Sequence, residues 1–196
     1  EEEIKLEKLK IQNRLLIVAI KSFASINHVA MVQQLLATPS LEYPAHLLEN
    51  AKKAAIDGYA YGNNFNAVNE LVNIDSEAPD SFNNECPRIA VQSYALGGHV
   101  ERAKNCFEQT RQYALHHMTD KKVRDLFLRC NLGEQIAAAF IYAARGYHVE
   151  AVNELLNEYH DIHDYNSAIY GYALGGHIDQ VNELLIKGGT SEKYAT

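Results

Sequence analysis

One stretch of sequence recurs five times along the chain, and its copies align with one another without a gap. The copies are Ile20–Leu36, Ile56–Val72, Val91–Phe107, Phe140–Leu156 and Ile169–Leu185. The third reads VQSYALGGHVERAKNCF and the fifth reads IYGYALGGHIDQVNELL. Such a repeat constrains the fold strongly, because every copy must form the same local unit and bury it against a neighbouring unit.

The first half of each copy has the apolar spacing of a helix. All copies share an alanine, called the anchor alanine below: Ala24, Ala60, Ala95, Ala144 and Ala173. Apolar residues stand four positions and one position before it, as Val91 and Tyr94 do in the third copy. This spacing predicts one apolar helix face. The small anchor would let a neighbouring helix approach closely.

A turn is expected directly after the anchor. The residues two positions after it are Ile26, Gly62, Gly97, Gly146 and Gly175. The residues four positions after it are His28, Asn64, His99, His148 and His177. Glycine at the first position predicts the left-handed residue that ends a helix, and the recurring histidine or asparagine predicts a structural turn or capping role. A shared metal is disfavoured, because stacked units would hold these side chains roughly 10 Å apart, whereas zinc ligands lie about 2 Å from the ion.

The second half of each copy is predicted to be another helix. In the fifth copy its apolar residues are Ile178, Val181, Leu184 and Leu185, and the other copies repeat this spacing. Polar residues such as Asn182 fall between them, which is typical of an amphipathic helix. Each copy is therefore predicted to be a helical hairpin, and strand signals are absent from the sequence.

The predicted fold is all-α: an α-solenoid of about five stacked helix-turn-helix repeats with no β-sheet, because one hairpin cannot bury its apolar face alone. We expect a single domain over residues 1–196, with repeat units at roughly 5–38, 44–75, 87–117, 131–160 and 164–188. The extra length before the fourth unit predicts an inserted helix at about 121–130, capped by Thr119 or Asp120. Asn131 and Glu134 would start the next helix as a capping pair.

Parts of the copies resemble known helical-repeat families. The stretches GHVERAKNCF and GHIDQVNELLIKGG are similar to the second helix of ankyrin repeats, with Gly-His, an acidic residue two positions later and an apolar pair. Tyr94, Gly98, Ala103 and Phe107 have the spacing of the signature residues of tetratricopeptide repeats, and DYNSAIYGYALGGHIDQVNELL resembles pentatricopeptide repeats. The resemblance implies a binding scaffold, since the first two families bind proteins and the third binds single-stranded RNA. Degenerate ankyrin-like arrays are also frequent in effectors secreted by intracellular bacteria, which would place the chain inside a host cell.

Charge and cysteine content narrow the partners and the compartment. The formal net charge of −7 does not supply the positive field on which non-specific nucleic-acid binding relies, so another protein is the expected partner. Cys86, Cys106 and Cys130 are widely spaced and odd in number, which favours a reducing compartment such as the cytoplasm. No stretch approaches the ~20 apolar residues of a membrane span. The oligomeric state stays open.

The partner-binding residues are predicted on the first helices, at the positions three and two before the anchor. Copies one to three have polar or small residues there, including Asp57 and Gln92, as expected for an exposed surface. Copies four and five instead have Ile141, Tyr142 and Tyr170. If these positions line a groove, the three side chains form an apolar and aromatic patch of the kind that binds partner proteins. The alternatives are that a neighbouring helix covers them or that the aromatic rings stack on RNA bases.

A catalytic or metal site is the remaining alternative. His160 and His163, with Asp161 and Asp164, could hold Zn²⁺ in a metal-dependent enzyme. The segment lies between units four and five, however, where a polar turn is expected. Cys106 falls on a repeated apolar position and is predicted to be a core residue. Because no catalytic motif is present, we expect no enzyme activity, no cofactor and no metal.

Overall fold

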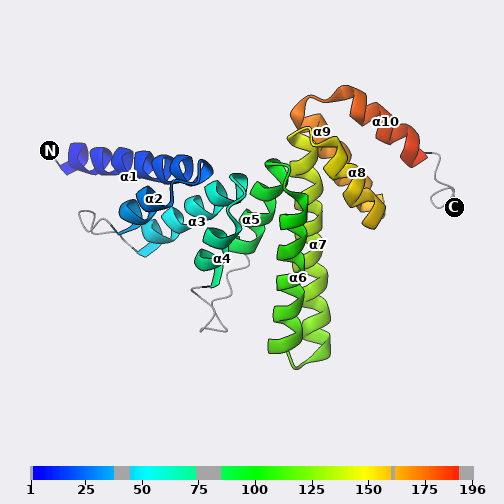
Figure 1. The fold of residues 1–196 in the computed structure, drawn as a ribbon, viewed down its shortest axis with the longest axis horizontal. Helices are drawn as coiled ribbons and strands as arrows, with labels where there is room; N and C mark the ends of the chain where they lie inside the picture. Colours follow the sequence, from blue (N-terminus) through cyan, green and yellow to red (C-terminus); the bar gives the residue numbers. More distant parts are fainter. Residues whose placement is uncertain (1, 38–44, 74–84, 160–161, 190–196) are drawn as a thin grey trace. The chain divides into compact units, whose positions relative to one another are not determined.

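The chain is all-α. The computed structural model describes residues 2–37, 45–73, 85–159 and 162–189, and it contains ten helices and no strand within those ranges (Figure 1). The helices are α1 (Glu2–Ser25), α2 (Val29–Leu36), α3 (Ala45–Tyr61), α4 (Phe65–Asn73), α5 (Glu85–Leu96), α6 (Val100–His117), α7 (Lys121–Arg145), α8 (Val149–Glu158), α9 (Ile162–Gly175) and α10 (Ile178–Gly189). Each predicted copy is a helical hairpin, and we number the hairpins one (α1–α2) to five (α9–α10). The chain divides into two compact units, Glu1–Ala90 and Val91–Thr196.

The turn inside each hairpin differs from the predicted one by one residue. The left-handed residue lies three positions after the anchor, at Asn27, Asn63, Gly98, Tyr147 and Gly176, with φ between 60° and 79°. The expected position, two after the anchor, is not left-handed, and Gly146 has a φ of −77°. The next amide closes the turn, as His148 N donates to Ala143 O at 3.0 Å. This is the bonding pattern of a Schellman turn, which asparagine tolerates as well as glycine.

In the first unit, the first helices of hairpins one and two pack tightly against each other. A β-carbon added at Gly58 of α3 would lie 2.6 Å from Ala24 Cβ of α1, closer than real β-carbons approach. Ala24 is completely buried. The small anchor therefore has the predicted effect of letting a neighbouring helix approach closely.

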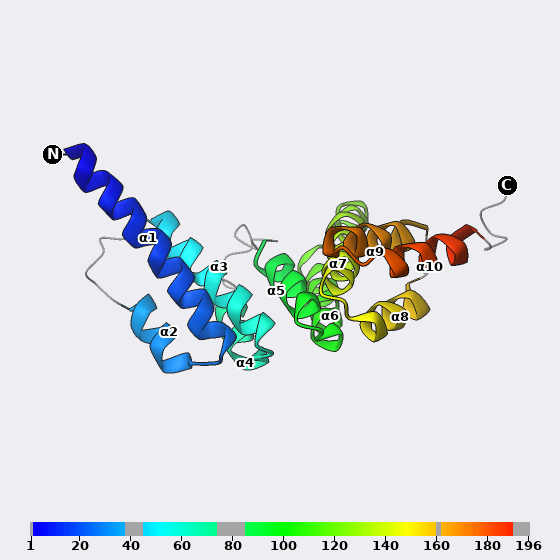
Figure 2. The same ribbon diagram turned by 90° about the horizontal axis from the view of Figure 1, so that it is seen from above.

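In the second unit, α7 packs against α6, α8 and α9. A β-carbon added at Gly171 of α9 would lie 2.9 Å from Ala144 Cβ of α7, which repeats the contact between Gly58 and Ala24. Figure 2 shows α7, α9 and α10 close together, and α9 contacts both of the other helices. Hairpins four and five thus pack through the same positions as hairpins one and two.

The predicted helix boundary near residue 131 is wrong. α7 runs without interruption from Lys121 to Arg145, and Asn131 and Glu134 lie inside it. Asp120 does cap the helix, because its Oδ1 accepts hydrogen bonds from Lys122 N at 2.8 Å and Val123 N at 3.1 Å. α6 packs along α7. The local capping signal at Asn131 is overridden, since a buried face stabilises a helix more than a capping pair does.

A buried polar contact joins α6 to α7. Gln135 Nε2 donates to Thr110 Oγ1 at 2.9 Å, and both side chains are buried. Burying these groups costs little because they satisfy one another. The pair holds the longer helices of the second unit in register, and these two helices lie side by side in Figure 1.

Within the described ranges, no helix is both long and apolar enough to cross a membrane. The arrangement of all five hairpins as one continuous array stays a prediction.

Candidate protein-binding face

The turn histidines of hairpins four and five form hydrogen bonds between hairpins. His148 Nε2 lies 2.8 Å from Leu96 O, and His177 Nε2 lies 3.2 Å from Arg145 O. Leu96 and Arg145 are the last residues of α5 and α7, where helix carbonyls have no partner within the helix. Each histidine therefore bonds the end of the preceding first helix, which is a structural role that local sequence patterns do not specify.

The glycines beside these histidines are explained by the same contact. A β-carbon at Gly146 would lie 2.8 Å from Leu96 O, and one at Gly175 would lie 2.8 Å from Arg145 O. The glycines two positions after the anchor thus make room for the preceding hairpin, rather than supplying a left-handed φ. Gly62 has the same role in the first unit, since its β-carbon would meet Ser25 O at 2.5 Å.

The remaining turn residues use other contacts. Asn27 Nδ2 donates to Gly62 O at 2.9 Å, and Asn64 Oδ1 accepts from Ala67 N at 3.2 Å as a true helix cap. His28 packs its ring against the edge of Phe23. His28, His99 and His148 stand at helix N-termini, but none of them makes a side-chain cap hydrogen bond. The predicted capping role thus holds for Asn64 and not for these histidines. Gly97 and Ile26 stand two positions after their anchors, where a left-handed residue was predicted. Neither residue is left-handed, and Ile26 is 70% exposed.

The five predicted partner-binding residues differ in their exposure and contacts. Tyr170 is 57% exposed on α9, whereas Ile141 and Tyr142 on α7 are half-buried. Gly171 lies directly over the backbone of Ile141, so the neighbouring helix partly covers the predicted patch. Gln92 is half-buried in α5, and Asp57 forms an ion pair with Lys21 in the first unit. Among the predicted residues, Tyr170 is the one large apolar or aromatic side chain that is more than half exposed.

Other exposed apolar residues accompany Tyr170 on hairpin five. We define the open face as Tyr170, Ala173, Leu174, Ile178 and Leu185. Leu174 is 52% exposed, Ile178 71% and Leu185 55%. The sequence contains only a weak signal for this face, because Leu174 is apolar where hairpin four has Arg145, but hairpins two and three are also apolar there, at Tyr61 and Leu96. That signal lies after the anchor, whereas the predicted patch was confined to positions before it.

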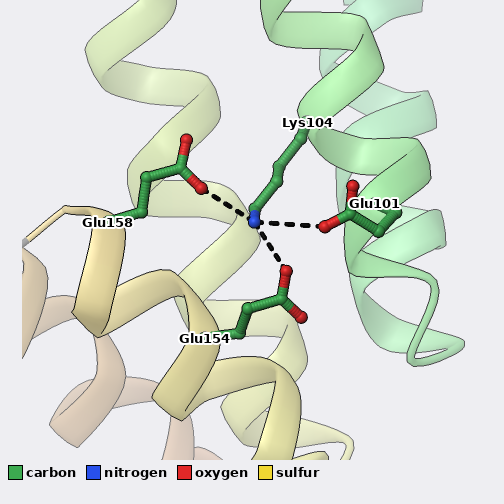
Figure 3. Close-up of polar contacts among 4 residues, drawn as sticks. All are labelled: Glu101, Lys104, Glu154 and Glu158. Carbon is green, nitrogen blue, oxygen red and sulfur yellow. Dashed lines mark hydrogen bonds and ion pairs between the residues drawn. The ribbon is translucent and has the colours of Figure 1, made fainter.

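A charge cluster on the second helices links hairpin three to hairpin four. Figure 3 shows Lys104 of α6 between Glu101 of the same helix and two glutamates of α8. Lys104 Nζ lies 2.6 Å from Glu154 Oε1 and 2.8 Å from Glu158 Oε2. Burial alone would lower the pKa of Lys104, but the hydrogen bonds to its three glutamate partners outweigh burial and raise it. The same bonds to Lys104 lower the pKa of Glu154 and Glu158. The lysine is therefore a charged clamp between α6 and α8 and not a base.

The structure describes only part of the cluster that the sequence offers as a metal or catalytic site. His160 and Asp161 lie outside the described residues, and His163 is exposed on α9. Within the described part of the chain, no group of three or more His, Cys, Asp or Glu side chains could hold a metal ion. Burial raises the pKa of the Cys106 thiol to about 12, which makes it a poor nucleophile. Cys106 is a core residue, as predicted.

No protein-family model, curated protein or solved structure matches this chain. The similarity of single copies to known repeats thus stays a resemblance.

Proposed function

We propose that the chain is a non-catalytic scaffold that binds a partner protein on the first-helix face of its solenoid, with the binding energy concentrated on the open face of hairpin five. The observation that carries this proposal is the exposure of Tyr170, Leu174 and Leu185 on one hairpin. Grouped apolar side chains of this kind are costly to leave in water and are typical of interaction surfaces. Tyrosine is also one of the residues in which binding energy concentrates.

Charge favours a protein over RNA as the partner. Hairpin five carries Asp179 and Glu183 in α10, and its basic Lys187 is already bound to Glu183 at 2.6 Å. RNA binding needs Lys and Arg to neutralise phosphates, and the open face as defined includes neither. Stacking on Tyr170 alone would not replace that contribution.

The free cysteines support a reducing compartment. Cys86, Cys106 and Cys130 form no disulfide bond in the described residues, and Cys130 is exposed. We place the scaffold in the cytoplasm on this basis. Delivery into a host cell by a bacterium is an extension for which the ankyrin resemblance is the support.

The experiment is a capture assay from cell lysate with the full chain as bait. We compare wild type with the Tyr170→Ala/Leu174→Ala variant, each with and without RNase. Leu126→Ala is the matched control, since Leu126 is a leucine of similar exposure, 59%, on α7 of the same unit.

The proposal predicts a protein that wild type and Leu126→Ala retain and the double variant loses, with no effect of RNase. If all retained material disappears on RNase treatment and at high salt, the scaffold binds RNA instead. Equal retention by wild type and the double variant contradicts the placement on hairpin five.

A further inference from the structure

The open face of hairpin five is the same surface that hairpins one and four bury. Ala24 and Ala144 are completely buried under the first helix of the next hairpin, whereas Ala173 is exposed. Leu156 of α8 is 8% exposed, and its equivalent in α10, Leu185, is 55% exposed. Within the described structure, no helix covers α9 at these positions. The two internal interfaces therefore show what kind of element fits there.

In the contacts of α3 with α1 and of α9 with α7, the covering helix approaches through two small residues. α3 places Gly58 and Gly62 against α1, and α9 places Gly171 and Gly175 against α7. Residues four apart lie on the same face of a helix. A β-carbon at any of these four positions would lie within 3 Å of a backbone atom of the covered helix. The fit is thus set by the absence of side chains on the arriving helix.

A third contact follows the second glycine. His148 and His177 stand two residues after Gly146 and Gly175, and each bonds the last carbonyl of the preceding first helix. On hairpin five the equivalent acceptor is the carbonyl of Leu174, because Leu174 directly follows Ala173 as Arg145 follows Ala144. A histidine arriving in the same register would reach it.

We propose that the open face receives an α-helix of a partner protein that carries glycine or another small residue at two positions four apart, followed two residues later by histidine or asparagine. The inference rests on the proposed function and specifies the partner: a helical hairpin that packs on hairpin five and extends the stack by one unit. The first small residue lies over Tyr170 and Ala173, the second lies over Leu174, and the polar side chain bonds Leu174 O.

A second copy of the chain does not fit this description. Its α9 already uses Gly171 and Gly175 against α7. Its α1 has Ser22 and Ile26 at the two positions, and the isoleucine side chain would occupy the space of the second glycine. A wild-type dimer that Leu174→Arg dissociates would overturn the proposal in favour of self-association.

The test adds the proposed occupant to the full chain. Residues 159–189 are repeated directly after Lys187, which reproduces the spacing between the anchors Ala144 and Ala173. The readout is the alkylation rate of an Ala173→Cys variant, measured by mass spectrometry of peptides. Cys130, which is exposed, serves as the internal reference.

The matched control replaces both glycines of the added copy by leucine. Leucine favours helix more than glycine does, so the added helices still form, as circular dichroism can verify. We expect alkylation of the thiol introduced at position 173 to slow on the order of tenfold with the glycine copy and to stay unchanged with the leucine copy. Equal protection by both copies, or protection by neither, overturns the proposal.

This experiment fails separately from the proposed function, because it needs no natural partner. Protection in the extended chain without any captured protein would refute the binding function but not the fit of the face. A captured partner that needs Tyr170 but still binds after its closely spaced small residues are changed to leucine would refute the fit and leave the scaffold function intact.

Discussion

Hairpins four and five have nearly the same pattern of residues, but the structure buries one and exposes the other. Ala144 and Leu156 of hairpin four are buried, while Ala173 and Leu185 of hairpin five are exposed. Both hairpins make the same Schellman turn and the same histidine bond to the preceding helix. The difference comes from the neighbour and not from the repeat itself. It shows that an apolar residue in a repeat is core only where another hairpin covers it, and a candidate binding residue elsewhere.

The largest expected effect contrasts the two equivalent leucines. Leu156→Ala should destabilise the protein by about 3 kcal/mol, because it removes buried methyl groups and leaves a cavity. Leu185→Ala should change stability by less than about 0.5 kcal/mol, because the side chain is exposed. Chemical denaturation of both variants checks this. Equal losses would mean that Leu185 is covered and that the comparison is wrong.

The next effect tests the close approach of α9 to α7. Gly171→Ala should cost about 2 kcal/mol, because the added carbon meets the backbone of Ile141, which cannot move aside easily. The control is Gly133→Ala in α7, where an added carbon meets nothing within 4 Å. Alanine there should stabilise the helix by about 0.5 to 1 kcal/mol. Thermal unfolding should shift in opposite directions for the two variants; shifts in the same direction would contradict the packing.

A smaller effect tests the histidine bond between hairpins. His148→Ala should cost about 1 kcal/mol, since it removes a part-buried hydrogen bond to Leu96 O. His116→Ala is the matched control, because His116 is exposed on α6 of the same unit. Stability is measured by urea denaturation. Equal losses of stability in the two variants would show that His148 does not stabilise the contact between hairpins.

The smallest effect concerns the Lys104 cluster and depends on pH. Because Glu154 and Glu158 have pKa values lowered from 4.5, their contribution is present above about pH 4.5 and is lost as pH falls through the lowered values. The pKa of Lys104 is raised above 10.5, so its contribution is complete below that pH and is lost as pH rises through the raised value. Lys104→Met should therefore cost about 0.5 kcal/mol near pH 7.

The pH profile distinguishes this cluster from a simple packing effect. The stability difference between wild type and Lys104→Met should stay constant between about pH 6 and 9 and shrink below about pH 4. Lys10→Met is the control, because Lys10 pairs on the surface with Glu7 at 2.8 Å and both side chains are more than half exposed. A difference that persists at low pH would show that Lys104 acts only through packing.

The helices of each hairpin could be predicted from the sequence because apolar spacing is a local property. The roles of the glycines could not, since Gly146 and Gly175 are required by carbonyls of the preceding helix, which lie far away in the sequence. The continuous α7 was missed for a similar reason: Asn131 is a good local cap, but packing against α6 decides the boundary. Of the open face, the predicted patch included only Tyr170, because the exposure of a residue depends on whether another hairpin packs over it.

The most direct test of the account compares two anchors by the reactivity of an introduced thiol. Ala144→Cys and Ala173→Cys variants of the full chain are treated with iodoacetamide, and alkylation is measured for each site relative to the exposed Cys130. The account predicts that the thiol at position 173 reacts at a rate similar to Cys130, while the thiol at position 144 is protected by on the order of a hundredfold. Similar protection at both anchors would show that hairpin five has no open face, and would contradict the proposed binding surface.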